Sequence, residues 1–144
     1  MVTYLKNMTP IKVFDSSYAL VTFDIERKII KVIWNGNHTV SEYKAAIGEA
    51  LNFQRVSGFP VYTYLSDIRN QGIVNPESRK WFERVAIPQA VNGGLRRAAV
   101  VYDASVFKNY YLNLILLAAN VYQLPLKFFG SMEEAYEWIE SFHD

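Results

Sequence analysis

The chain has 144 residues and no cysteine, and its 15 Lys and Arg residues against 14 Asp and Glu residues give a formal net charge of +1. These values exclude disulfides and thiolate metal sites, and they argue against a nucleic-acid-binding protein, which usually carries a clustered basic excess. A 51% apolar chain of this length buries roughly 70% of its unfolded surface in one core, so residues 1–144 are predicted to form a single domain.

The first apolar segments of the chain predict a β-hairpin. Residues 19–24 and 29–34 are rich in β-branched and aromatic side chains, and a short polar link joins them. The preceding residues 1–18 are interpreted as an N-terminal extension, with an edge strand at residues 11–14 as one interpretation.

A turn and a helix are predicted after the hairpin. Residues 35–38 are expected to form the turn. Thr39 and Glu42 then form a capping-box pattern, in which a hydroxyl and a carboxylate satisfy backbone N–H groups at the start of a helix. Gly58 predicts the end of that helix. It is followed by a strand at residues 61–65 and a polar loop at residues 66–72.

The start of a second helix is predicted at Asn75 and Pro76, because Asn caps helices and Pro fits the first helical position. Pro88 is expected to break or kink this helix near Ile87, since a residue before proline avoids the helical conformation. The remaining expected elements are a strand at residues 97–102, a helix at 104–123, a strand at 126–129 and a helix that opens at Ser131.

Strands and helices alternate from residue 29 onward, which predicts an α/β fold with a mainly parallel sheet. The expected architecture is a five-stranded sheet opened by a β-hairpin, with about four helices. Residues 114–119, the longest uninterrupted apolar run, are too short for a membrane span of roughly 20 residues. Residues 1–10 lack the apolar segment of a signal peptide, so a cytoplasmic protein is expected.

This order of elements carries a family resemblance. A Trp34-Asn35-Gly36 turn before a Thr-capped helix, Asp67 at the end of the central strand, and a closing Phe129-Gly130-Ser131-Met132-Glu133-Glu134-Ala135 with Trp138 resemble the STAS or SpoIIAA-like family. The likeness covers about residues 19–142 and is nearest to an uncharacterised bacterial branch of STAS and SEC14 type. It implies a small domain of protein–protein signalling, or a relative of lipid-carrying domains.

The chain departs from the family at its phosphorylated serine. Members that act as anti-sigma-factor antagonists carry an Asp-Ser-Ser/Thr-Gly-type run after the central strand, whereas residues 65–69 here are Leu-Ser-Asp-Ile-Arg. Ser66 therefore inherits no phosphoacceptor role from the resemblance. Ser78, just inside the second predicted helix, is only a weak substitute.

Polar residues expected at the carboxyl ends of the parallel strands are the candidate site, because ligands of open sheets usually bind there. They are Asn35, Asn37, His38, Ser66, Asp67, Arg69, Asp103, Ser105 and Ser131. A hydrolase would use His38 as the base for a nucleophilic Ser66 or Ser105. Asp67 or Asp103 would then orient the base. The chain has no Gly-x-Ser-x-Gly motif, and the alternative is that such residues cap helices or pair locally.

Neither catalysis nor a metal or cofactor is expected. His38 and His143 are the only two histidines, whereas transition-metal sites usually need several converging ligands. The glycines at residues 93–94 precede a strand rather than a helix, so they do not form a phosphate-binding loop.

The helix at residues 104–123 is the most informative segment, because it is apolar nearly all round. Its predicted apolar face comprises Phe107, Tyr110, Tyr111, Leu114, Leu117, Ala118 and Val121, and Leu112, Ile115, Ala119 and Tyr122 extend this face around the helix. The remaining strip carries no charge and consists of Asn109, Asn113, Leu116, Asn120 and Gln123, of which the first four are the candidate interface residues. Such a strip is typical of protein interfaces, so these four residues are predicted to contact a second copy in a homodimer. The alternative is burial of the helix under residues 1–18.

These observations predict a non-enzymatic, STAS-like protein-interaction or regulatory module. The surface expected to meet an unidentified protein partner is the segment from Asp67 to Glu77, with Arg69 and Asn75. The alternative is a small apolar-ligand or lipid-binding domain of SEC14-like type, which the 22 aromatic residues (3 Trp, 10 Tyr and 9 Phe) and a pocket beside the third helix would favour.

Overall fold

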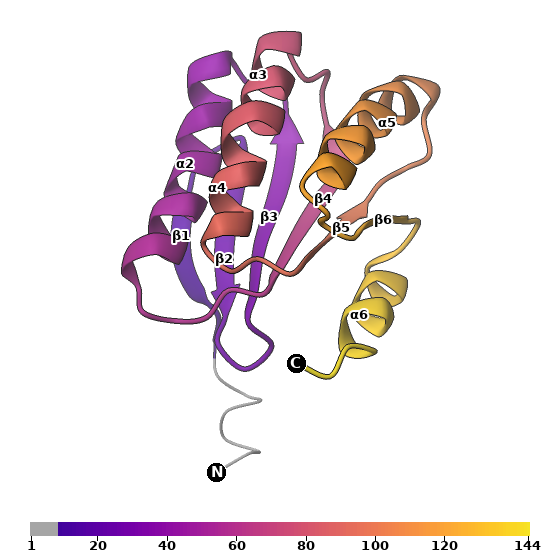
Figure 1. The fold of residues 1–144 in the computed structure, drawn as a ribbon. Helices are drawn as coiled ribbons and strands as arrows, with labels where there is room; N and C mark the ends of the chain where they lie inside the picture. Colours follow the sequence, from indigo (N-terminus) through magenta and orange to yellow (C-terminus); the bar gives the residue numbers. More distant parts are fainter. Residues whose placement is uncertain (1–8) are drawn as a thin grey trace.

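The computed structural model describes residues 9–144, in which six strands form one sheet in chain order (Figure 1). Strands β1 (Ile11–Asp15), β2 (Ala19–Asp24) and β3 (Ile29–Gly36) pair antiparallel. Strands β4 (Thr63–Gln71), β5 (Arg97–Val101) and β6 (Leu126–Phe129) continue the sheet parallel to β3. The expected five strands are therefore joined by a sixth, because the edge strand in the N-terminal extension is present as β1.

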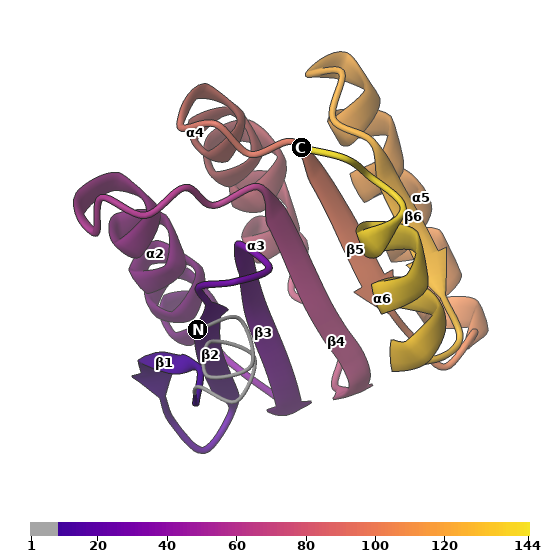
Figure 2. The ribbon, with the colours of Figure 1, turned by 90° about the horizontal axis from the view of Figure 1, so that it is seen from below.

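The helices divide unequally between the two faces of this sheet (Figures 1 and 2). They are α2 (Val40–Val56), α3 (Pro76–Trp81), the π-helix η1 (Phe82–Ala86), α4 (Ile87–Asn92), α5 (Val106–Val121) and α6 (Met132–Glu140). The parallel strands are added in one direction, so crossovers of one hand place all their helices on one face. Among the helices of residues 9–144, only α6, which follows the last strand, covers the other face.

The core accordingly has two layers. On the crossover face, Trp34 and Val100 of the sheet pack with Tyr43 of α2 and Leu112 of α5. On the opposite face, Leu65 and Val101 belong to a cluster with Ala135 and Ile139 of α6. Strand β5 is thus buried on both sides, as its nearly continuous apolar sequence predicts.

The predicted helix starts are confirmed. The Thr39 hydroxyl accepts a hydrogen bond from the Glu42 N–H at 3.1 Å, and the Glu42 carboxylate accepts one from the Thr39 N–H at 2.8 Å. Asn75 caps α3 by accepting from the Glu77 N–H at 2.8 Å, and the Ser131 hydroxyl accepts from Glu134 at the start of α6. These local signals therefore fix where the helices begin.

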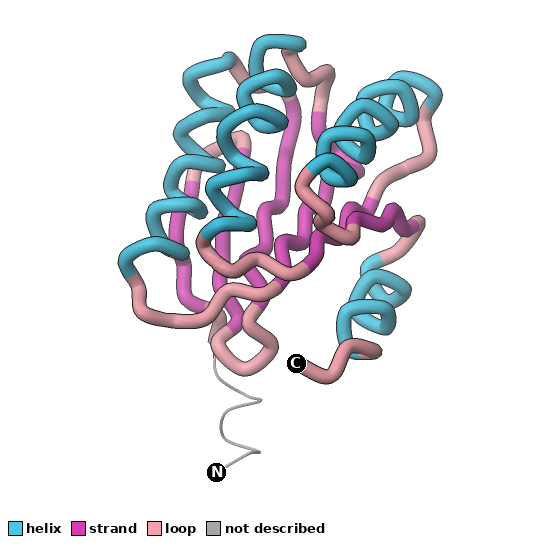
Figure 3. Tube along the Cα trace, viewed as in Figure 1, coloured by secondary structure: helices cyan, strands magenta, loops and turns pink. Residues whose placement is uncertain are grey.

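Of the break or kink expected near Pro88, no break is found, but the helix departs from ordinary α-helical geometry just before this residue. Helix α3 passes through η1 into α4 without a break and continues to Asn92, as Figure 3 shows. The N–H of Ile87 donates to the carbonyl of Phe82, five residues earlier, which is a π-type bond. This wider turn changes the hydrogen-bond register next to Pro88, where the ring and the missing N–H disrupt an ordinary α-helix.

The prediction of a loop at residues 66–72 is wrong, because β4 continues to Gln71. Strand β3 likewise extends through Gly36, so residues 35–36 belong to the sheet rather than to a turn. The register between the two strands shifts, because two steps of β3 from Ile33 to Asn35 match three steps of β4 from Asp67 to Asn70. The polar sequence at the end of β4 is therefore paired with β3 on the far side of this irregularity.

Helix α5 buries only one side of the wide apolar face predicted for it, the side that extends around the helix through Leu112, Ile115 and Ala119. Three other residues of the predicted face are exposed: Tyr110, Leu117 and Val121. Tyr111, Leu114 and Ala118 are partly buried, and the side chain of Phe107 lies outside the described part of the structure. A helix that is apolar nearly all round has no polar face to fix its rotation, so packing decides it.

The extension does not bury α5 through any residue that the structure describes. Residues 9–18 lie with β1 at the edge of the sheet opposite β6, and residues 1–8 lie outside the described residues. α5 packs over β5, where Ala119 and Ala98 share one cluster. None of the helices within residues 9–144 combines the length and the apolar character needed to cross a bilayer.

Candidate functional site

A cleft of about 650 Å³ lies where β4 and β5 end, the place expected for a ligand of an open parallel sheet. Its walls come from the segment that follows β4 and from the start of α5. Residues on these walls include Arg69, Ile73, Arg79, Asp103, Lys108 and Tyr110. Arg69, Asp103 and Ser105, which the sequence placed at strand ends, are therefore brought to one cleft.

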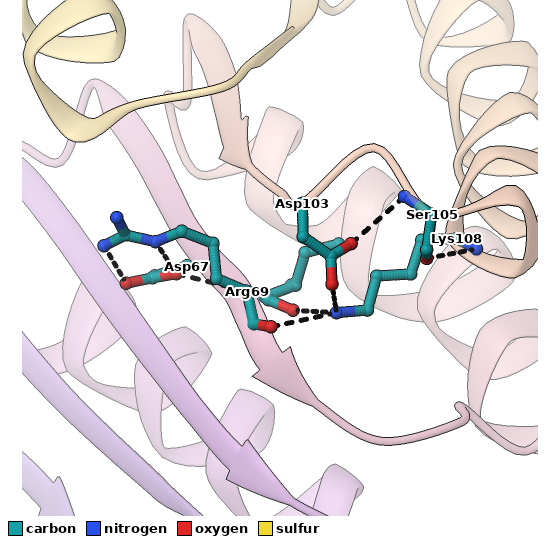
Figure 4. A network of polar contacts seen from close by, with 6 residues as sticks. Asp67, Arg69, Asp103, Ser105 and Lys108 are labelled. Carbon is teal, nitrogen blue, oxygen red and sulfur yellow. Dashed lines mark hydrogen bonds and ion pairs between the residues drawn. The ribbon is translucent and has the colours of Figure 1, made fainter.

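Lys108 organises this end of the sheet (Figure 4). Its Nζ donates to the carbonyl oxygens of Ile68 at 2.7 Å and Arg69 at 3.2 Å, and lies 3.2 Å from Oδ2 of Asp103. β5 pairs with β4 only as far as Asp67, so carbonyl groups beyond that point need other donors. The sequence analysis missed Lys108. Its position as the single charged residue of an apolar helix was the available signal.

Asp103 and Ser105 hold the start of α5. The Ser105 N–H donates to Oδ1 of Asp103 at 3.2 Å, and the Ser105 hydroxyl accepts from the Lys108 N–H at 3.3 Å. The bond from the Ser105 N–H, with that from the Lys108 ammonium, lowers the pKa of the Asp103 carboxyl. Ala104 between them has φ of 61°, a left-handed conformation that non-glycine residues rarely adopt. This arrangement is a helix cap, which was the predicted alternative to a catalytic role for Asp103 and Ser105.

Asp67 and Arg69 pair with each other within β4. Nε of Arg69 lies 3.0 Å from Oδ1 of Asp67, Nη2 lies 2.8 Å from Oδ2, and the Arg69 N–H also donates to Oδ1. Burial alone would raise the pKa of the Asp67 carboxyl, but these hydrogen bonds hold it below its usual value. Both carboxylate oxygens are thus already engaged, which leaves Asp67 poorly placed to act as a base or a ligand.

The other residues predicted to bind a partner do not share one surface. Asn75 uses its side chain to cap α3, whereas Glu77 is exposed and lines a different groove with Lys44 and Trp81. Ile73, between them and the end of β4, is 81% exposed and lines the strand-end cleft. Of the four residues predicted to bind a partner, Arg69 alone lines the strand-end cleft.

His38 is held apart from the serines and carboxylates of the hypothetical hydrolase. Its Nε2 lies 3.0 Å from Nε2 of Gln71, and its ring packs against those of Trp34 and Tyr43. Burial lowers the pKa of the imidazole, which favours its neutral form. The polar contacts of Asp67 and of Ser105 go to other partners, so within residues 9–144 these side chains form no nucleophile–base–carboxylate relay.

The two serines considered as phosphoacceptors are buried in this conformation. Ser66 lies on the crossover face of β4, and Ser78 lies in the first turn of α3. The hydroxyl of Ser78 has no hydrogen-bond partner within residues 9–144. A kinase would therefore need a local opening of the fold to reach either hydroxyl.

An apolar cavity of about 60 Å³ lies under the crossover helices and is the place where a buried ligand would bind. Tyr64 and Tyr111 are among the residues that line it, and burial raises the pKa of Tyr64 to about 12. Pockets for small ligands usually measure about 300–1,000 Å³. The cavity in this conformation therefore does not favour the lipid-binding alternative.

The outer face of α5 is a second candidate site, and it is apolar. Val106, Tyr110, Leu117 and Val121 are 81%, 72%, 64% and 74% exposed. The predicted interface residues Asn109, Asn113 and Asn120 are exposed among them, whereas Leu116 is only partly exposed. We call these seven exposed residues the α5 face. The α5 face adjoins the strand-end cleft, because Tyr110 belongs to the α5 face and also lines the cleft.

Comparison with known proteins supports the fold and leaves the site unassigned. No family model and no curated protein matches the chain. The chain is similar to the crystal structure of an uncharacterised protein of the DUF3478 family with a SpoIIAA-like fold, from Shewanella loihica PV-4. The TM-score is 0.58 and the identity 15%, over 88% of this chain and 98% of that one. The chain therefore has a SpoIIAA-like α/β fold, which confirms the fold expected from the sequence.

Proposed function

We propose that the protein is a non-enzymatic interaction module whose α5 face binds a second copy of the chain. The observation that carries this proposal is an exposed helix face with four large apolar side chains and no charge. Solvent-facing helices normally carry charged residues, whereas the centres of protein interfaces are depleted in charge and enriched in aromatic side chains such as Tyr110.

The same property favours a second copy over an unrelated partner. A face that binds itself across a two-fold axis places each group near its own equivalent, so like charges would repel. The α5 face carries none, and its Asn109, Asn113 and Asn120 amides each have a donor and an acceptor. Two such faces can therefore pair their amides as well as their apolar side chains.

The residues of the predicted interface contribute differently in this proposal. Leu117 and Tyr110 supply the central apolar contacts, because they project further into solvent than Leu116. The three asparagines surround them and provide hydrogen bonds. Leu116, being partly buried, supports the helix from beneath and supplies a smaller share of the contact.

A further protein partner would bind in the strand-end cleft, at the start of α5. Ile73 and Tyr110 give it an apolar rim, and Arg69 and Arg79 lie on its walls. Asp67 and Asn75 hold the backbone of this segment rather than reaching outward. The regulatory role expected from the resemblance would be carried by this rim.

The size of the particle in solution tests the α5 interface. Wild-type protein should have the mass of a dimer in size-exclusion chromatography with light scattering, and Leu117→Glu should give a monomer, because it buries two carboxylates against each other. Val56→Glu is the matched control, since Val56 is also an exposed apolar residue but ends α2. A wild-type monomer at high concentration, or a Leu117→Glu dimer, would refute the proposal.

A further inference from the structure

We propose that Arg96 and Arg97 form a carboxylate-binding site, which Asp144 of the same chain fills in this structure and which can accept an acidic side chain of another protein. The site lies at the amino ends of β4 and β5, so it is separate from both the strand-end cleft and the α5 face. Figure 2 shows the C-terminal segment after α6 running to the start of β5.

The geometry at Arg97 is that of bidentate carboxylate recognition. Nη2 of Arg97 lies 2.6 Å from Oδ1 of Asp144, and Nη1 lies 2.8 Å from Oδ2. Nη1 also donates to the hydroxyl of Thr63 at 3.1 Å. Only 4% of Arg97 is exposed, and a buried guanidinium of this kind requires an anionic partner.

Both arginines are held in place by groups that do not belong to the C-terminal segment. Thr63 of β4 positions Arg97, and the guanidinium of Arg96 lies 3.6 Å from the centre of the Tyr62 ring. Arg96 adds a third contact to the carboxylate, with Nη1 3.1 Å from Oδ1 of Asp144. The two cations therefore stay converged when Asp144 leaves, which is the preorganisation that a binding site needs.

The present occupant comes from a weakly attached segment. Residues 141–144 belong to no helix or strand and are exposed. Apart from the arginine contacts, they are held by hydrogen bonds to the last turn of α6 and by Phe142, which packs on Trp138 and on Arg97. Release of these four residues would leave α6 and the sheet intact, so exchange of the occupant disturbs only a local part of the fold.

One donor of the site is unused. Nε of Arg97 is buried and has no hydrogen-bond partner within residues 9–144. A buried donor without a partner is unfavourable, so Asp144 satisfies the site only in part. An incoming acidic side chain that binds the Nε and Nη2 edge of the guanidinium, instead of the Nη1 and Nη2 edge, would use a donor that Asp144 leaves free.

The experiment empties the site in the full-length chain and measures its affinity for a simple carboxylate. Asp144→Ala is compared with wild type by thermal unfolding in rising sodium acetate, with sodium chloride at equal ionic strength as reference. Acetate should raise the melting temperature of Asp144→Ala and leave that of wild type unchanged, because the wild-type site is filled. Asp15→Ala is the matched control, since it removes a carboxylate from an exposed ion pair with Lys12.

Two further variants complete the test. Adding Arg96→Ala to Asp144→Ala should weaken the acetate response by removing one exposed cation without touching the core. Asp144→Asn keeps the shape of the segment and serves if Asp144→Ala is unstable. A folded Asp144→Ala or Asp144→Asn that responds equally to acetate and chloride would overturn the proposal, as would a response to inorganic phosphate but not to acetate. Unfolding of both variants would also overturn it, because Asp144 would then be an obligatory part of the fold.

Discussion

Helices α5 and α6 pack on opposite faces of the same sheet, and they expose side chains of different character to solvent. α6 buries Ala135 and Ile139, and its outer residues are all acidic: Glu133, Glu134, Glu137 and Glu140. α5 buries Leu112, Ile115 and Ala119 in the same manner, but its outer face is apolar or amide. The two helices are alike in their buried side chains and differ in their exposed ones, which are acidic on α6 and uncharged on α5. The exposed side chains, rather than the buried ones, therefore indicate which helix is suited to bind another chain.

The first turns of the two helices differ as well. α6 begins with Glu133 and Glu134, whose charges interact favourably with the positive end of the helix dipole. α5 instead has Lys108 in its first turn, where the dipole disfavours a cation. The carbonyl groups of Ile68 and Arg69 explain this exception, because they accept from Lys108. The start of α5 is therefore built around the end of β4.

The largest expected effect is a loss of stability, and it tests whether the buried side chains of α5 and α6 contribute equally to the free energy of unfolding. Leu112→Ala and Ile139→Ala should each lower the free energy of unfolding by about 2–5 kcal/mol, since each leaves a cavity in the core. Leu117→Ala on the α5 face should change it by less than about 0.5 kcal/mol under conditions where the protein is monomeric. Urea unfolding of the three variants measures this. A Leu117→Ala loss as large as that of Leu112→Ala would mean that the α5 face is part of the core.

A smaller effect tests the exception in the first turn of α5. Lys108→Met keeps the apolar stem but removes the donor, so the free energy of unfolding should fall by about 1–3 kcal/mol. Lys80→Met, at an exposed position of α3, is the control and should change it by less than about 0.5 kcal/mol. Hydrogen exchange at the carboxyl end of β4 should also become faster in Lys108→Met alone. Equal behaviour of the two variants would contradict the role given to Lys108.

The smallest effect concerns acid. The pKa of Asp103 is lowered in the folded protein, so its contribution to stability is present above its ordinary pKa of about 4 and is lost as the pH falls through the folded value. Asp103→Asn should therefore reduce stability slightly at neutral pH and flatten its decline below about pH 4. Glu137→Gln on α6 is the comparison. Urea unfolding at neutral and acidic pH measures both, and an unchanged acid decline in Asp103→Asn would contradict the prediction.

What the sequence predicts well in this chain is what neighbouring residues decide among themselves. The caps at Thr39, Asn75, Ser105 and Ser131 are satisfied by N–H groups two or three residues away. The alternation of strands and helices likewise follows from local patterns, and with it the α/β fold. These features need no knowledge of the remaining chain.

The sequence fails where a distant segment decides. The polar end of β4 stays in the sheet because Lys108, 40 positions after Ile68, supplies donors to it. The rotation of α5 depends on what its sides contact, and the pairing of Arg97 with Asp144 joins residues 47 positions apart. For the same reason the sequence predicts the candidate site only in part. The order of strands and helices indicates which residues lie at the strand ends, but it does not indicate which side chains they contact.

Every strand of the sheet lies beside the strand made just before it. The sheet can therefore grow outward from the first hairpin as the polypeptide leaves the ribosome, with each new strand and helix docking onto an edge already present. No strand has to wait for a later one before it can pair. Within residues 9–144, α5, β6 and α6 are synthesised last, so the segments that carry the α5 face and Asp144 dock onto strands that have already formed.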